Sequence, residues 1–245
     1  MPGTPDVTPD PALDALQGCR LFAGLDDTSL RLLTDASRHR RFRKGETIFH
    51  AGDPGDALFI VTTGRVKIIV PSEDGGDPAI LTTIGPGGFF GELALLDGAP
   101  RSATAVGHGA VTAAVLQREA FERLMDDQPT MRRTLLAALA AEIRRLTAQV
   151  EDLHFLDLPG RLARHLLRSL PGVAADDVVL GIGLPDGEAR LAWPFTQGEL
   201  AGMIGGSRQS VNRLLADFVA DGLLHFEGDE LVIPDVRRLG QAARR

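Results

Sequence analysis

Short runs of strand-forming residues, separated by glycine-rich turns, fill the first half of the chain. Runs of this kind are found at 46–49, 57–61, 65–70, 80–84 and 111–116. Their length and even spacing are typical of the strands of a sandwich or jelly roll. A short capped helix is predicted just before them, at residues 26–33. We therefore expect an all-β module over residues 21–117.

A helical pattern replaces the strands from about Arg118 to His154. Its apolar positions are spaced alternately three and four residues apart, which is the a/d pattern of a coiled coil. A helix that packs on its own domain usually carries a wider apolar face, so pairing of two chains is favoured over packing on the β-module. We expect residues 118–157 to form a dimerisation helix and the chain to be a homodimer. The predicted seam consists of Leu136, Leu139, Ile143, Leu146, Val150 and Leu153.

The tripeptide Leu158-Pro159-Gly160 interrupts the long helical pattern. Proline and glycine are expected to break the helix here and to act as a hinge. An amphipathic helix is predicted at 161–168, and a strand-like run follows at 178–182. A second module is therefore expected over residues 158–245.

Two capped helices around a double glycine are predicted in this second module. Thr196 and Glu199 fit a capping box at the start of the first helix. Gly205-Gly206 can end it, because glycine tolerates a positive φ, and Ser207 can cap the second helix. Two short strands around Gly228-Asp229 would add a β-hairpin wing. This arrangement predicts a winged helix-turn-helix that contacts DNA through Thr196, Ser207, Arg208, Gln209, Ser210, Asn212 and Arg213.

The charge balance limits how such a chain would bind DNA. The net charge is −7, and residues 160–245 hold ten arginines against eleven acidic residues. This argues against a protein that coats nucleic acid nonspecifically. Affinity would come from a focused patch, from dimeric binding and from base contacts. A plain helical hairpin with a solvated polar face is disfavoured, because the capping box, the double glycine and the polar helix occur together.

The segment from Gly91 to Ala103 gathers the groups that a sugar phosphate needs. The Glu92 carboxylate can accept a hydrogen bond from a ribose hydroxyl, and the Arg101 guanidinium can pair with a phosphate through two parallel hydrogen bonds. Ser102 and backbone amides can complete the anion cradle. Buried Glu and Arg are costly unless they are paired or liganded, so this combination favours a ligand.

This segment resembles the phosphate-binding cassette of cyclic-nucleotide-binding domains. The order of β-module, long helix and winged helix is similar to that of the Crp/Fnr family of transcription regulators, the family of the cAMP receptor protein. The resemblance covers residues from about 21 to 233 and rests on the segments 91–95, 100–103, 155–163 and 207–213. It implies an α+β fold: an N-terminal cyclic-nucleotide-binding β jelly roll, a long dimerisation helix and a C-terminal winged helix-turn-helix.

The resemblance also implies an effector and partners. Glu92 would bind the ribose 2′-hydroxyl, with the backbone of Gly91 and Leu93 nearby, while Arg101 and Ser102 would hold the cyclic phosphate. The implied effector is cAMP, with cGMP or cyclic di-GMP as the alternative and ligand-independent DNA binding as another. Dimers of this family bind pseudo-palindromic DNA with one recognition helix per half-site. RNA polymerase is the further expected partner.

Two positions depart from the family pattern. In the enterobacterial-type cAMP receptors a Thr-Ser pair on the dimer helix contacts the adenine, and here Leu146 and Thr147 occupy those positions. Leu146 cannot hydrogen-bond a base, but Thr147 still could, across the dimer. Gln209 stands where many relatives carry Glu. Glutamate accepts from cytosine whereas glutamine favours adenine, so we expect a different half-site at that base pair.

Other classes of function are disfavoured. Cys19 is the only cysteine, which excludes an intrachain disulfide and thiolate-held iron–sulfur or zinc sites, and the histidines show no metal-ligand spacing. Haem sensing has no supporting His or Cys pattern. The chain carries no phosphate-transfer loop, nucleophile elbow or paired catalytic carboxylates, so it is not expected to be an enzyme. The winged helix argues against a nucleotide-gated subunit of an enzyme or channel.

The N-terminal residues and the hydropathy indicate the expected location. Residues 1–20 are predicted to be a disordered tail, and the N-terminus has neither a basic n-region nor an apolar h-region. No apolar run approaches the roughly 20 residues that span a bilayer. We therefore expect a cytoplasmic protein with no membrane partner.

Overall fold

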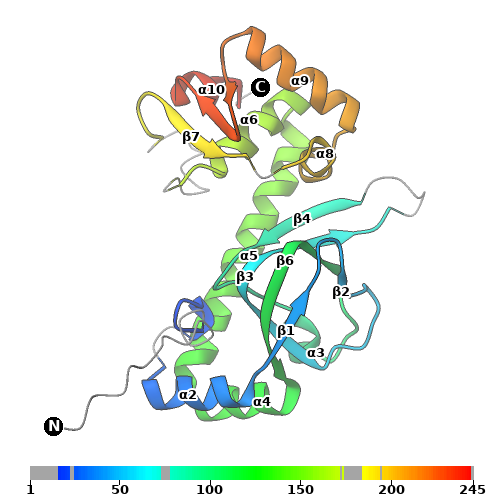
Figure 1. Ribbon diagram of the computed structural model, residues 1–245, viewed down its shortest axis with the longest axis vertical. Coiled ribbons are helices and arrows are strands. Elements are labelled where there is room, and N and C mark those ends of the chain that lie inside the picture. The colour runs from blue at the N-terminus through cyan, green and yellow to red at the C-terminus, as the bar shows by residue number, and fades with distance from the viewer. Residues whose placement is uncertain are drawn as a thin grey trace, which may run out of the picture. The chain divides into compact units, whose positions relative to one another are not determined.

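The computed structural model divides into two compact units, Met1–Ala141 and Glu142–Arg245 (Figure 1). It describes residues 16–22, 25–72, 78–171, 173, 184–193 and 195–243. The division falls inside helix α5 (Pro129–Phe155), upstream of the domain limit expected at 157/158. Each unit buries hydrophobic clusters of its own.

A six-stranded antiparallel sheet forms the centre of the first unit (Figure 1). Its central pair, β3 and β6, are both 14 residues long, β1 and β4 flank them, and β2 and β5 pair with β6 and β3. The strands are β1 (Arg38–Phe42), β2 (Thr47–Phe49), β3 (Ala57–Val70), β4 (Ala79–Ile84), β5 (Phe89–Phe90) and β6 (Thr104–Gln117).

Strand β3 joins two runs that the sequence pattern predicted as separate strands. Its pairing with β6 changes register between Val61 and Arg65, and Gly64 has a φ of 78°. A Cβ at Gly64 would lie 2.2 Å from the Ala110 carbonyl oxygen, so only glycine fits this approach of the two strands. The irregularity acts like a bulge, which bends the strand without ending it.

The helices of the first unit include one break that the heptad pattern did not predict. They are η1 (Arg20–Phe22), α2 (Asp27–Ala36), α3 (Leu93–Asp97), α4 (Arg118–Asp127) and the first part of α5. A single helix from Arg118 was expected, and this prediction is wrong. Pro129 disfavours a helical conformation at the residue before it, and Gln128 has φ −121° and ψ 87°, so α4 ends and α5 begins there.

The end of the predicted N-terminal tail is folded. Leu16 and Cys19 are fully buried in one hydrophobic cluster with Phe22, Phe121 and Met131, so the expected disorder over 1–20 is wrong for these positions. Burial raises the pKa of the Cys19 thiol to about 11, which keeps it protonated at neutral pH. Residues 1–15, which include most of the predicted tail, lie outside the described residues.

Helix α5 has two apolar faces with different surroundings. Met131 and Leu135 are at most 1% exposed within the core of the first unit, and Leu139 packs against the same core. The other predicted seam residues are exposed: Leu136, Ile143, Leu146, Val150 and Leu153. Leu136 and Ile143 are 66% and 64% exposed, whereas the apolar face of a core helix is buried.

The second unit combines a three-stranded sheet in the order β7-β9-β8 with helices, of which α6, α8, α9 and α10 are labelled in Figure 1. The predicted wing strands are present, and β7 adds a strand that the sequence pattern did not indicate. The run at 178–182 lies outside the described residues. The elements are α6 (Leu158–Arg168), β7 (Ala189–Ala192), α8 (Gln197–Ile204), α9 (Arg208–Ala220), β8 (His225–Glu227), β9 (Glu230–Ile233) and α10 (Val236–Ala242).

The expected hinge tripeptide is helical. Residues 158–160 form the first turn of α6, and the Asp157 carboxylate caps that turn by accepting a hydrogen bond from the Gly160 amide at 2.8 Å. Proline is well tolerated there, because the first amides of a helix have no intrahelical acceptor. The break between α5 and α6 is therefore confined to Leu156 and Asp157.

Candidate functional site

Arg101 is the buried centre of the predicted cassette. Arg101 is only 5% exposed. Its Nη1 atom donates to the Gly91 carbonyl oxygen at 2.6 Å, and its Nη2 atom donates to the Ala57 carbonyl oxygen at 2.8 Å. These bonds tie Arg101, three residues before β6, to Gly91 just after β5 and to Ala57 at the start of β3. The guanidinium is thus held in one place by the backbone of the sheet.

The surroundings of Arg101 keep a buried cation in place. Its Cζ atom lies 4.3 Å from the centroid of the Phe49 ring and 5.8 Å from that of Phe59. Burial lowers the pKa of Arg101, and the carboxylates of Asp56 and Glu92 oppose that shift. The Nε atom is buried with no hydrogen-bond partner among the described residues. A buried donor without an acceptor is costly, so its presence here is consistent with a functional role for this guanidinium.

Two glycines allow the backbone to close around Arg101. A Cβ at Gly91 would lie 2.5 Å from the Arg101 Nη1 atom, and the φ of Gly91 is 84°. A Cβ at Gly55 would lie 2.3 Å from the Ala94 Cβ and 3.1 Å from the Arg101 Cζ. Side chains at either position would displace the guanidinium or helix α3.

A second arginine, Arg118, supports the cassette and was not singled out from the sequence. Its Nη2 atom donates to the carbonyl oxygens of Gly55 at 2.7 Å and Ala94 at 2.9 Å, and its Nη1 atom donates to that of Leu95 at 3.2 Å. It fixes α3, whose last residues have unsatisfied carbonyl groups. In the sequence, Arg118 stands only at the expected start of a helix, so no local pattern could have revealed that it holds α3.

The other predicted ligand residues lie around Arg101 in the first unit, with one exception. Gly91 and Glu92 are half-buried just before α3, whereas Leu93 and Ser102 are exposed. Thr147 lies on α5 in the second unit, where its hydroxyl donates to the Ile143 carbonyl oxygen at 3.0 Å. The cassette of the first unit thus combines a buried cation, an acidic group and an exposed hydroxyl.

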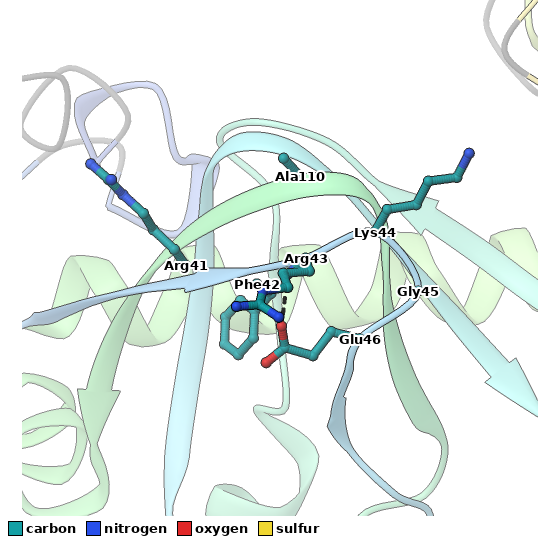
Figure 2. A pocket seen from close by; sticks show the side chains of 7 residues that line it. All are labelled: Arg41, Phe42, Arg43, Lys44, Gly45, Glu46 and Ala110. Carbon is teal, nitrogen blue, oxygen red and sulfur yellow. Dashed lines mark hydrogen bonds between the residues drawn. The ribbon is translucent and has the colours of Figure 1, made fainter.

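A separate surface hollow lies where β1 turns into β2 (Figure 2). Figure 2 shows Arg41 and Lys44 pointing away from each other, and the Arg43 amide donates to the Glu46 carboxylate at 2.7 Å. No cassette residue lines this hollow. Exposed charges on β1, at one end of the strand order, discourage pairing with a strand of another molecule. The lining residues are Arg41, Phe42, Arg43, Lys44, Gly45, Glu46 and Ala110.

The predicted capping box at the start of α8 is confirmed. The Glu199 amide donates to the Thr196 hydroxyl at 3.2 Å, and the Thr196 amide donates to the Glu199 carboxylate at 2.8 Å. Gly205 ends α8 with a φ of 68°, as the double glycine predicted. Ser207 then caps α9 by accepting from the Ser210 amide at 3.1 Å.

Helix α9 separates a buried face from a polar exposed face. Val211, Leu214, Leu215 and Phe218 are buried in the core of the second unit. The predicted reading residues are exposed, except for Ser210, which is half-buried: Ser207, Arg208, Gln209, Asn212 and Arg213. Side chains of these types can hydrogen-bond base edges in the major groove and backbone phosphates.

Gln197 is a further residue of this surface that sequence reasoning missed. Its Nε2 atom donates to the Asn212 Oδ1 atom at 2.8 Å, which links α8 to the exposed face of α9. The two residues are 15 positions apart, so only the packing of the helices reveals the bond. The bond uses the Asn212 side-chain oxygen as acceptor, so it does not occupy the donors of the same amide.

The wing carries paired charges. Arg190 on β7 forms ion pairs with Glu188 at 2.9 Å, Glu227 at 2.8 Å and Glu230 at 3.4 Å. Hydrogen bonds from His225 and Arg190 lower the pKa of the Glu227 carboxyl. Arg190 is thus surrounded by acidic groups next to the wing, so it offers little attraction for phosphates.

Within the described residues, no group of three or more His, Cys, Asp or Glu side chains could hold a metal ion. No helix among them is long and apolar enough to cross a membrane.

Known protein families match both units. A cyclic nucleotide-binding domain matches residues 39–128, and a Crp-like helix-turn-helix domain matches residues 160–242. The chain is 36% identical to the CRP-like cAMP-activated global transcriptional regulator of Mycobacterium tuberculosis, over 91% of this chain and 96% of that protein. The chain belongs to the Crp/Fnr family of transcription regulators.

Other Crp/Fnr regulators share the same architecture. The cyclic AMP receptor protein of Thermus thermophilus is 32% identical over 85% of this chain and 89% of its own length. The structure of the c-di-GMP responsive global regulator CLP of Xanthomonas campestris has a TM-score of 0.68 and 28% identity, and covers 85% of this chain and 99% of that one. These matches confirm the predicted fold class and family. This Crp/Fnr regulator is a DNA-binding transcription regulator with a cyclic nucleotide as effector, and not an enzyme.

Proposed function

We propose that this Crp/Fnr regulator is a homodimer whose DNA binding is gated by cAMP, bound at the cassette around Arg101. The observation that carries the proposal is the buried guanidinium. Arg101 is 5% exposed, is oriented by two carbonyl groups and keeps a buried Nε without a partner among the described residues. A preorganised cation of this kind suits the single negative charge of a cyclic phosphate.

We assign the remaining cassette residues to the rest of the nucleotide. The Glu92 carboxylate would accept from the ribose 2′-hydroxyl, with the backbone of Gly91 and Leu93 beside it. Ser102, which is exposed next to Arg101, would donate to the phosphate. Thr147 on α5 would contact the base from the partner chain. The relatives described as cAMP-activated support cAMP as the effector.

The exposed stripe of α5 supports the dimer. Ile143 is 64% exposed and Val150 53%, and apolar groups repeated at this spacing are stable in water only when another helix covers them. We expect Ile143→Asp to give monomers in sedimentation velocity, because a charge would be buried at the centre of the seam. Ala141→Asp, on an exposed position off the seam, is the matched control and should leave a dimer. A dimeric Ile143→Asp protein would contradict the seam.

The dimer would place two α9 helices on a pseudo-palindromic site, one in each half-site. Arg208, Gln209, Asn212 and Arg213 would read bases, while Thr196, Ser207 and Ser210 would lie against phosphates. cAMP can switch this binding only if it binds one arrangement of the dimer more tightly than another. RNA polymerase is the expected partner at the promoter, and the cytoplasm is the expected location.

Cyclic di-GMP is the second candidate effector, for a specific reason. Leu146 stands where enterobacterial-type receptors contact the adenine with a hydroxyl, and the structurally similar CLP is described as c-di-GMP responsive. The phosphate-binding groups would serve either ligand, so the choice depends on the part of the site that meets the base.

Calorimetric titration with cAMP, cGMP and cyclic di-GMP tests the proposal directly. We expect one cAMP per chain with a Kd of about 1 µM or below, and weaker binding of both comparators. The affinity for a promoter fragment should then rise when cAMP is added at saturating concentration. Tighter binding of cyclic di-GMP than of cAMP would show that cyclic di-GMP is the effector. If none of the three nucleotides binds, the cassette is not a nucleotide site.

A further inference from the structure

A buried carboxylate at the end of α5 holds two arginines of α6. Asp152 is 7% exposed, and its Oδ1 atom accepts from the Arg164 Nη1 atom at 2.6 Å. Its Oδ2 atom accepts from the Arg168 Nη1 atom at 2.5 Å. One acid therefore joins the last turn of α5 to two successive turns of α6. We call these three residues the Asp152 clamp.

The clamp also reaches the end of the chain. The Arg164 Nη2 atom donates to the Ala243 carbonyl oxygen at 3.2 Å, just after α10. Removal of the Asp152 charge would leave two half-buried guanidinium groups close together, with the half-buried His165 beside them. Unpaired buried cations repel each other and cannot be solvated, so the corner between α5 and α6 would loosen.

The turn of the helix-turn-helix packs on this same corner. A Cβ at Gly205 would lie 3.1 Å from the Arg161 Nη1 atom and 3.2 Å from the Leu153 Cδ2 atom. A Cβ at Gly206 would lie 3.0 and 3.1 Å from the two methyl groups of Leu158. The turn that precedes α9 thus rests against the last turn of α5 and the first turn of α6.

We propose that Asp152 is a positioning residue that locks the end of α5 to the helix-turn-helix, so that α9 moves as one body with the last turn of α5. The flexible point that permits α9 to change position then lies on the N-terminal side of the clamp and not at residues 158–160. This inference rests on the proposed gating by nucleotide. Asp152 belongs neither to the cassette nor to α9, yet nucleotide binding at the cassette would depend on it to change the position of α9.

The chain offers a matched control on the same helix. Glu142 also pairs with an arginine, Arg145 at 2.6 Å, and both residues of that pair lie on α5. Asp152→Asn removes the bridging charge with little change of shape, and Glu142→Gln removes the local one. Both variants keep every residue of the cassette and of α9.

Three measurements on the full-length protein separate the possible results. Calorimetry gives cAMP affinity, fluorescence anisotropy gives promoter affinity with and without cAMP, and hydrogen–deuterium exchange reports on the amides of residues 205–210. For Asp152→Asn we expect cAMP affinity within about twofold of the native protein. We expect amide exchange at least about tenfold faster, and a cAMP-dependent gain in promoter affinity smaller by about tenfold. Glu142→Gln should change none of these.

The exchange data keep this inference separate from the proposed function. If promoter binding by the native protein does not respond to cAMP, the gating proposal fails, and the amides of residues 205–210 still decide whether the clamp holds the turn. Native-like exchange in Asp152→Asn would overturn the inference, as would an undiminished response to cAMP. If that variant does not fold, Arg168→Gln, which keeps the Arg164 bond, should show the same changes at smaller size. Native-like amide exchange in Arg168→Gln, or an undiminished response to cAMP, would also overturn the inference.

Discussion

The arginines of the two units differ in what surrounds them before any ligand arrives. Arg101 in the first unit is 5% exposed and is oriented by two carbonyl groups and two aromatic rings. Arg208 and Arg213 on α9 in the second unit are exposed. The first is fixed in advance for one small anion, whereas the other two can adjust to bases and phosphates.

The difference explains how one residue type can serve two kinds of recognition. A buried guanidinium loses little further entropy when a ligand binds, so its specificity comes from the fixed position. An exposed guanidinium must be ordered by its target, but it can fit more than one base sequence. The comparison predicts that loss of the buried arginine is the more damaging change.

Arg101→Ala should give the largest effect. We expect cAMP affinity to fall by about 3–5 kcal/mol, because a fixed buried cation opposite the phosphate would be lost. Isothermal titration calorimetry measures the loss, and sedimentation should still show a dimer. Arg41→Ala, which removes an exposed arginine of the same unit, is the control and should bind cAMP normally. Unchanged affinity of Arg101→Ala would show that the phosphate is held elsewhere.

Arg208→Ala should give an intermediate effect on DNA. We expect specific binding to weaken by about 1–3 kcal/mol per half-site, with discrimination lost at one base pair. Competition between promoter and random DNA in anisotropy measurements distinguishes the roles, because a phosphate contact would weaken both equally. An equal loss of affinity for promoter and random DNA would show that Arg208 contacts the DNA backbone and not a base.

His165 extends the comparison to a basic group that burial leaves neutral. Burial, with the adjacent Arg168 charge, lowers the pKa of His165 to about 4. The unfolded chain then binds a proton between about pH 6.5 and pH 4 that the folded chain does not, so stability falls as the pH falls through this window. We expect a loss of about 2 kcal/mol in the free energy of unfolding between pH 7.5 and pH 5.

Urea unfolding at pH 7.5, 6 and 5 measures this dependence. His165→Leu should flatten it, whereas His39→Gln, which changes an exposed histidine of the first unit, should not. A native protein with equal free energy of unfolding at pH 7.5 and pH 5 would show that His165 titrates normally.

The local signals in the sequence predicted local structure well. The capping box of Thr196 and Glu199, the glycine that ends α8 and the Ser207 cap all depend on residues at most four positions apart, and all are present. The cassette was recognised for the same reason, since Gly91 to Ser102 is one short segment. The fold class followed from the order of such segments.

The features that the sequence did not reveal depend on distant residues or lack an apolar pattern. Strand β1 has exposed residues at four of its five positions, so no alternation marks it as a strand. The bond from Arg101 to the Ala57 carbonyl spans 44 positions, and those from Asp152 to α6 span 12 and 16. Pro129 was visible in the sequence, but helix-forming residues continue on both sides of it and concealed the break that it makes.

The burial of Cys19 makes the protein convenient for spectroscopy. It is the only cysteine in the chain, it is fully buried, and its pKa of about 11 leaves little reactive thiolate at neutral pH. A thiol-reactive fluorophore or spin label should therefore not react with Cys19 in the folded protein and should attach only to a cysteine introduced on the surface. Labels on α5 and α9 could then follow the motion of the reading helix against a background that needs no prior substitution.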